Sequence, residues 1–191
     1  FWPGTKTGEG LVDPLTGKPL LVVWETYGGD EHELFVKIAR EFADEILMAA
    51  AAPPRLTATV AGLYRKAEAL DAASITAEDA GRLGRLYLML SESYADEARR
   101  YLKRAVDGGG TVEEKVALGN ALLYLGDARG ARQIYLDVSR RRPQDPVLLV
   151  NLALAEKAMG DTPSAYGRLR QVMLKTKDPD IEHASSLGIA E

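Results

Sequence analysis

Two neighbouring stretches of this chain match each other at an interval of 34 residues, and this repeat constrains the fold more than any other feature. The matching pairs are Leu118 and Leu152, Gly119 and Ala153, Gly126-Asp127 and Gly160-Asp161, Ala131 and Ala165, Tyr135 and Leu169, and Val138 and Val172. Small residues recur where two helices of a hairpin must touch, and large apolar residues recur where hairpins must stack. A period of 34 with two helices per unit predicts a helical solenoid.

Turn and capping residues divide the rest of the chain into further helices. Thr111 with Glu114 forms the pattern of a capping box, and Asp30 with Glu33 forms another at the start of a helix that we expect to run to about residue 51. Gly108-Gly109-Gly110 is a helix stop. The later predicted helices are 55–70, 77–91, 94–107, 112–125, 128–141, 146–159, 162–175 and a last piece from 179.

The first part of the chain has a different composition. Both tryptophans and all three phenylalanines lie within residues 1–42, and residues 1–19 are rich in Gly, Pro and Thr. We expect 1–29 to form an extended arm with one strand at 20–25, because Leu-Leu-Val-Val-Trp-Glu is the best strand candidate. A single strand needs a partner, so the arm would pair with another chain or lie on helices. Residues 30–76 are expected to form an N-terminal helical hairpin.

Glu113–Asp145 resembles a tetratricopeptide repeat (TPR), with Leu118-Gly119 in its first helix, Gly126-Asp127 at its turn and Pro143 at its end. The units that resemble this family are 77–111, which is degenerate because its helices are two residues too far apart, 112–145, 146–178, and 179–191, a capping or truncated helix. The resemblance implies an all-α, TPR-like solenoid of helical hairpins, with the arm and the short strand added.

Members of this superfamily bind a peptide or a helix of a partner protein on a concave face, which the first helix of each pair lines. The resemblance therefore implies a non-enzymatic adaptor or scaffold, as part of a larger assembly. By position, the residues expected to face the groove are Val116, Asn120, Leu123, Tyr124, Val147, Val150, Asn151, Leu154 and Lys157. Their mostly apolar character favours a hydrophobic segment as the ligand.

Asn120 and Asn151 are 31 residues apart. In chaperone-binding members of the family, two Asn at that spacing hold the backbone and the C-terminal carboxylate of a peptide. Those members also need a Lys one turn before the first Asn, where this chain has Val116. Three interpretations stay open: a carboxylate site, a general polar contact to a peptide, or a structural Asn pair.

Charge is unevenly distributed along the chain. Residues 129–177 hold ten Lys or Arg and four Asp or Glu, a balance of +6, whereas the whole chain carries −4. Arg140, Arg141 and Arg142 either complement a helix C-terminus or form a basic patch for an acidic partner, including the 30–45 stretch of a second copy. The net negative charge, without aromatic and basic residues interleaved, argues against nucleic acid as a partner.

The stretch Leu20–Glu45 is also similar to the first βα unit of extracytoplasmic solute-binding proteins of ABC importers. There the loop after the first strand contacts the ligand, and here that loop would be Trp24, Glu25, Thr26 and Tyr27. This similarity implies an alternative function, an accessory small-molecule binding protein of the cell envelope. The rest of that two-lobed fold does not fit in the remaining chain.

Composition argues against catalysis and bound cofactors. The chain has no Cys and only two His, His32 and His183, so thiol chemistry and Cys-based metal sites are absent and general acid–base chemistry is poorly supplied. His32-Glu33 lacks the second His of a zinc protease, and the Gly108 run lacks the Lys of a phosphate loop. We therefore expect no metal, no cofactor and no enzyme activity.

The start of the chain leaves its location open. Phe1-Trp2-Pro3-Gly4 would suit the interfacial flank of an upstream membrane helix, and a trimmed soluble chain is the alternative. Membrane association is expected only through such an upstream anchor. The similarity to binding proteins favours the extracytoplasmic side of a bacterial envelope. The arm would also allow a homo-oligomer.

Overall fold

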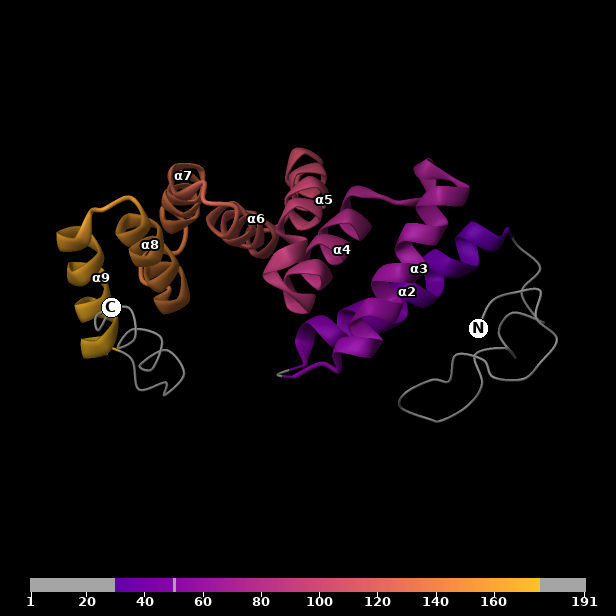
Figure 1. The fold of residues 1–191 in the computed structure, drawn as a ribbon, viewed down its shortest axis with the longest axis horizontal. Coiled ribbons are helices and arrows are strands. Elements are labelled where there is room, and N and C mark those ends of the chain that lie inside the picture. Colours follow the sequence, from indigo (N-terminus) through magenta and orange to yellow (C-terminus); the bar gives the residue numbers. More distant parts are fainter. Residues whose placement is uncertain (1–29, 50, 176–191) are drawn as a thin grey trace.

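The computed structural model describes residues 30–49 and 51–175, and in this part of the chain it is all-α (Figure 1). The α-helices are α2 (Glu31–Met48), α3 (Pro54–Leu70), α4 (Ala77–Leu90), α5 (Ala95–Asp107), α6 (Val112–Tyr124), α7 (Ala128–Ser139), α8 (Pro146–Ala158) and α9 (Thr162–Lys175). Two short 3₁₀ turns, η1 (Ala72–Ser74) and η2 (Glu92–Tyr94), precede α4 and α5. The predicted all-α fold of helical hairpins is confirmed.

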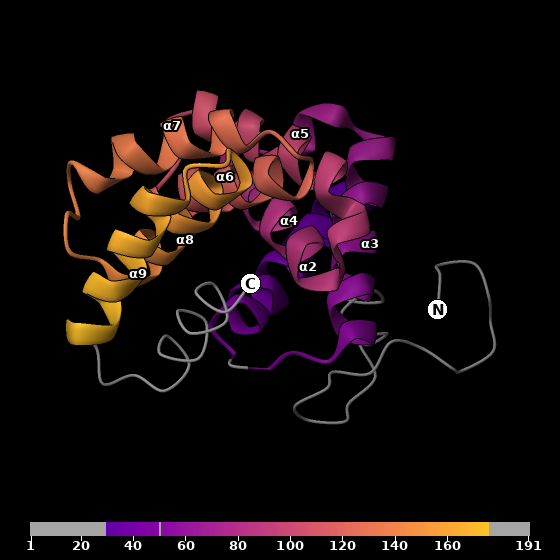
Figure 2. The ribbon, with the colours of Figure 1, turned by 60° about the vertical axis from the view of Figure 1, so that its left-hand side comes forward.

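Consecutive helices pair as four antiparallel hairpins, which stack into a curved row (Figures 1 and 2). Each helix packs most closely against its hairpin partner, and the first helices α2, α4, α6 and α8 also contact one another in succession. Second helices of neighbouring hairpins have far fewer mutual contacts. The first helices therefore form the inner side of the curve, as Figure 2 shows for α4, α6 and α8.

Several predictions fall on residues that lie outside the described part of the chain. These are the extended arm 1–29, its strand at 20–25 and the final helix from 179. Within the described residues the predicted helix ends are correct to one or two residues, except for α2. That helix ends at Met48 instead of about residue 51, because Ala49 already has an extended backbone with ψ 137°.

The repeated Gly-Asp pair turns the chain between the two helices of a hairpin. Gly126 and Gly160 have φ values of 81° and 83°, in the left-handed region where a side chain is strained. Each following Asp then caps the next helix, since the Asp127 carboxylate accepts a hydrogen bond from the Gly130 N–H at 2.9 Å. The repeat therefore marks both the end of one helix and the start of the next.

The degenerate unit 77–111 absorbs its two extra residues at its turn. Helix α4 is one residue longer than α6, and the connection to α5 contains the extra 3₁₀ turn η2. The Ser91 side chain holds this turn by accepting a hydrogen bond from the Ser93 N–H at 3.2 Å. The unit therefore keeps the hairpin geometry although its sequence spacing differs.

Two capping predictions have different outcomes. Thr111 and Glu114 form the predicted capping box at the start of α6. Asp30 occupies the N-cap position of α2, but its side chain accepts no hydrogen bond from the backbone of that helix, so the predicted second capping box is wrong. Asp30 is exposed, so water can hydrate its carboxylate, which needs no hydrogen bond from the first turn of the helix.

The hairpins pack through buried small residues, as the repeat predicted. Ala98, Ala131 and Ala165 occupy the same place in successive second helices, and all three are buried. Across from them, a Cβ at Gly119 would lie no more than 3.0 Å from three ring carbons of the buried Tyr135. The close approach of α6 to α7 therefore depends on a residue without a side chain.

We expect Gly119→Ala and Gly62→Ala to have opposite effects on stability. Alanine gains up to about 1 kcal/mol over glycine in a helix interior, and at Gly62 in α3 nothing lies within 4 Å of the added carbon. At Gly119 the overlap with Tyr135 outweighs that gain, with a net loss of about 1–2 kcal/mol. Urea denaturation followed by circular dichroism measures both, and equal stabilisation would contradict the close helix contact.

None of the helices in the described residues is both long enough and apolar enough to pass through a lipid bilayer.

Candidate partner-binding cleft

A cleft of about 370 Å³ opens on the inner side of the row, between α4, α6 and α8. We call it the inner cleft; its lining residues are Arg85, Val112, Glu113, Val116, Ala117, Asn120, Val138, Arg142, Asp145, Val147 and Leu148. The wall is mostly aliphatic, with a few charged and amide groups among the apolar side chains. Such a combination is typical of a surface that binds an apolar group and orients it with polar contacts.

Three of the residues predicted to face the groove line the inner cleft: Val116, Asn120 and Val147. Five others lie outside its lining on the same two first helices, namely Leu123, Tyr124, Asn151, Leu154 and Lys157. The prediction for Val150 is wrong. Its side chain is only 7% exposed and packs in a core cluster with Leu169 and Val172 of α9. Helix α8 contacts α6, α7 and α9, so it is buried on more than one side.

Asn120 and Asn151 bond to each other and to the core. Asn151 Nδ2 donates to Asn120 Oδ1 at 3.2 Å, and the Tyr135 hydroxyl donates to the same oxygen at 2.7 Å. These bonds connect α6, α7 and α8. Both hydrogen bonds to Asn120 Oδ1 come from within the protein, as the structural interpretation of this pair expects.

An ion pair lies in the lining of the inner cleft. Arg142 Nη1 lies 3.0 Å from Glu113 Oε1, although the two residues come from the connection after α7 and from the start of α6. The pKa of Glu113 is lowered by a hydrogen bond from its own backbone N–H, and the positive charges of Arg142 and Arg85 add to that effect. Glu113 is therefore ionised at neutral pH and neutralises Arg142.

All three arginines of the predicted basic patch are exposed at the end of α7 and in the connection that follows it. Arg140 and Arg141 follow the end of α7 and are exposed to solvent, and Arg140 lies 3.8 Å from Asp137. Arg142 instead pairs with Glu113 at the inner cleft. Two of the three arginines therefore have an acidic neighbour within the protein, and a basic patch for an acidic partner stays a prediction.

Four large apolar side chains are exposed on the first helices, either in the lining of the inner cleft or at helical spacing from a lining residue. Tyr124 and Val147 are about half exposed, at 50% and 52%, and Met89 and Leu154 are exposed at 43% and 37%. They belong to α4, α6 and α8. Exposed apolar groups of this size that share a helix face with the lining of a cleft are typical of a surface that a partner covers.

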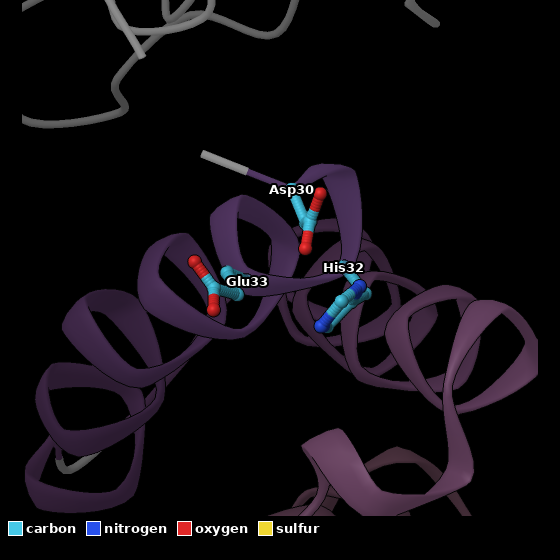
Figure 3. A group of neighbouring side chains, drawn as sticks. All are labelled: Asp30, His32 and Glu33. Atoms are coloured by element: carbon cyan, nitrogen blue, oxygen red, sulfur yellow. The ribbon is translucent and has the colours of Figure 1, made fainter. Parts of the chain in front are cut away.

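A second group of ligand-type side chains lies on the first turn of α2 (Figure 3). One donor atom from each of Asp30, His32 and Glu33 lies within 4.8 Å of the other two. The His32 Nε2 atom is also 3.8 Å from a carboxylate oxygen of Asp71, which follows α3. Carboxylates at the N-terminus of a helix are favoured by the positive end of the helix dipole. This effect accounts for acidic residues at the start of α2 without a bound ion.

Sequence reasoning missed the contribution of α4 to the inner cleft. Arg85 follows Leu83-Gly84, the pair that the degenerate repeat shares with Leu118-Gly119, so the register of the repeat could have placed it at the position equivalent to Asn120.

The alternative ligand loop, Trp24 to Tyr27, lies outside the described residues. No family model matches this chain.

Proposed function

We propose that this chain is a TPR-type adaptor without enzyme activity, which binds a peptide or a helix of a partner protein along the inner side of its curved row. The observation that carries this proposal is the inner cleft together with the exposed Met89, Tyr124, Val147 and Leu154 beside it. An apolar surface of this kind is favoured to bury against another apolar segment. The proposal includes membership of the TPR superfamily, which the buried Ala positions and the Gly-Asp turns support.

The polar groups of the inner cleft favour binding over chemistry. Glu113 is paired with Arg142, and the Asp145 carboxylate accepts a hydrogen bond from the Leu148 N–H at 3.1 Å as the cap of α8. Asn120 Oδ1 already accepts two hydrogen bonds. A general base needs a carboxylate or an imidazole that is free to take a proton from a substrate, and both carboxylates of this lining are engaged.

Site-specific photocrosslinking tests the proposed binding surface. We expect a benzoylphenylalanine at Val147, beside the inner cleft, to form an adduct with a partner protein in native extract. The same probe at Gln133, an exposed residue of α7, should form no such adduct. Adding Val116→Glu should remove the adduct at Val147, because a charge in the aliphatic wall is costly to bury.

The choice of variant follows from the packing. Substituting Asn120 would disturb its bonds to Tyr135 and Asn151, so loss of binding could then reflect a disturbed hairpin. Circular dichroism of Val116→Glu checks that its helices are intact. An adduct at Gln133 but none at Val147 would move the binding surface to the second helices and contradict the proposal. Adducts that persist with Val116→Glu would also contradict it.

A further inference from the structure

We infer that the inner cleft selects a partner segment in which an acidic side chain lies next to an aliphatic one, with Arg85 binding the carboxylate. This inference rests on the proposed function and adds to it the chemistry of the partner. It depends on the surroundings of Arg85, a residue of α4 that lines the inner cleft.

Arg85 differs from the other partly buried arginines of the described residues. Five arginines there are neither exposed nor fully buried, and four of them have a carboxylate oxygen within 4.0 Å. Those four are Arg82, Arg99, Arg132 and Arg168. Within residues 30–49 and 51–175, Arg85 makes no hydrogen bond and no ion pair. A guanidinium that is partly removed from water without a partner is poorly compensated, and an incoming carboxylate would correct this.

The two carboxylates on which the charge of Arg85 acts already have their own arginines. Glu113 is paired with Arg142 at 3.0 Å, and Asp44 of α2 accepts from Arg82 Nε at 2.8 Å. Arg85 acts on both only at longer range, where its charge helps to lower their pKa values. Asp145, the other carboxylate of the lining, caps α8 by accepting a hydrogen bond from the Leu148 N–H at 3.1 Å. Among the described residues, Arg85 is therefore the one cationic side chain of the inner cleft without a carboxylate oxygen within 4.0 Å, and a ligand carboxylate is its complement.

The other walls of the inner cleft define what must lie beside that carboxylate. Val112, Val116, Ala117 and Val138 form an aliphatic wall, and Val147 presents a half-exposed side chain at the rim. An aliphatic side chain of the partner fits against them. A guanidinium binds a carboxylate in a bidentate manner, which fixes the orientation of the segment as well as its charge. A segment with Lys or Arg at the same place would be repelled.

Selection from a phage-displayed library of random 12-residue peptides tests this inference. We expect the wild-type protein to enrich peptides that carry Asp or Glu next to Val, Leu or Ile. Arg85→Glu should weaken the best of these peptides at least tenfold and should itself enrich Lys or Arg at that place. Arg170→Glu, an exposed arginine of α9, is the matched control and should change the affinity less than twofold.

A double-mutant cycle assigns the contact to Arg85. Replacing the acidic residue of the best peptide by its amide should weaken binding to the wild type about tenfold, and should have little effect on binding to Arg85→Gln.

Enrichment of peptides without acidic residues, no enrichment at all, or an unchanged affinity of the amide peptide would overturn the inference. If Val147→Glu abolishes peptide binding while Arg85 variants do not alter it, the inference fails and the proposed function stands. If neither variant alters it, both fail. Thermal melting checks that Arg85→Gln and Arg85→Glu are folded.

Discussion

Asp79→Ala should lower the free energy of unfolding by roughly 3 kcal/mol, since breaking a buried ion pair from one side is among the most costly single changes. The Asp79 side chain is fully buried, and its two oxygens accept hydrogen bonds from Arg40 Nε and Nη2 at 2.7 and 2.6 Å. It also caps α4 through the N–H of Thr76 at 3.0 Å. One carboxylate therefore holds the first hairpin against the second. Arg40 is 45% exposed, so water can solvate its guanidinium once Asp79 is removed. The expected loss is therefore smaller than for an ion pair in which both side chains are buried.

Asp44→Ala is the matched control for Asp79→Ala. Asp44 pairs with Arg82 across the same two helices, but its side chain is 57% exposed, so its loss should cost less than about 1 kcal/mol. Urea denaturation of the three proteins measures the difference. Similar values for the two variants would contradict the distinct role of the buried carboxylate.

Asp79 should also make the stability of the protein depend on pH. Burial would raise the pKa of Asp79, but the hydrogen bonds from Arg40 and Thr76 outweigh burial and hold that pKa below its usual range. A carboxyl group with a lowered pKa stabilises the fold fully above its unfolded value of about 3.9, and this contribution is lost as pH falls through the folded value. Wild-type stability should therefore fall below about pH 4, with a shallower slope in Asp79→Asn.

Ala131→Leu should cost about 1–3 kcal/mol through overpacking. Ala131 has no exposed surface and lies in a core cluster with Tyr135, Val138 and Leu148. Three additional carbon atoms there must displace one of these side chains or push α6 and α7 apart. Ala165→Leu is expected to behave similarly, because Ala165 has the same place in the next hairpin and is only 2% exposed.

Ala58→Leu in α3 makes the same chemical change at an exposed position. We expect its free energy of unfolding to stay within about 0.5 kcal/mol of the wild type. Thermal and urea denaturation of the variants give the comparison. Wild-type stability in both Ala131→Leu and Ala165→Leu would show that the repeat register is wrong.

The sequence predicted more of the fold than of the candidate site. Helix ends follow local chemistry, so Gly126-Asp127 and Thr111 with Glu114 could be assigned from spacing alone. Which residues line the inner cleft depends on the rotation of each helix about its axis. Val147 is half exposed and Val150, three positions further along α8, is buried. The apolar character of α8 gave no signal for this difference, because a helix packed on several sides has no single apolar stripe.

What the sequence determined by itself is therefore the hairpin and its repetition, because a 34-residue period states where each turn and each small contact residue must occur. What only the tertiary structure decided is how polar groups pair between hairpins. Arg40 and Asp79 are 39 residues apart, and Arg142 and Glu113 are 29 apart, so no local pattern joins them. Stacking of the hairpins pairs these arginines and leaves Arg85 without an ion pair among the described residues, since Glu113 in the same cleft pairs with Arg142 and Asp145 caps α8.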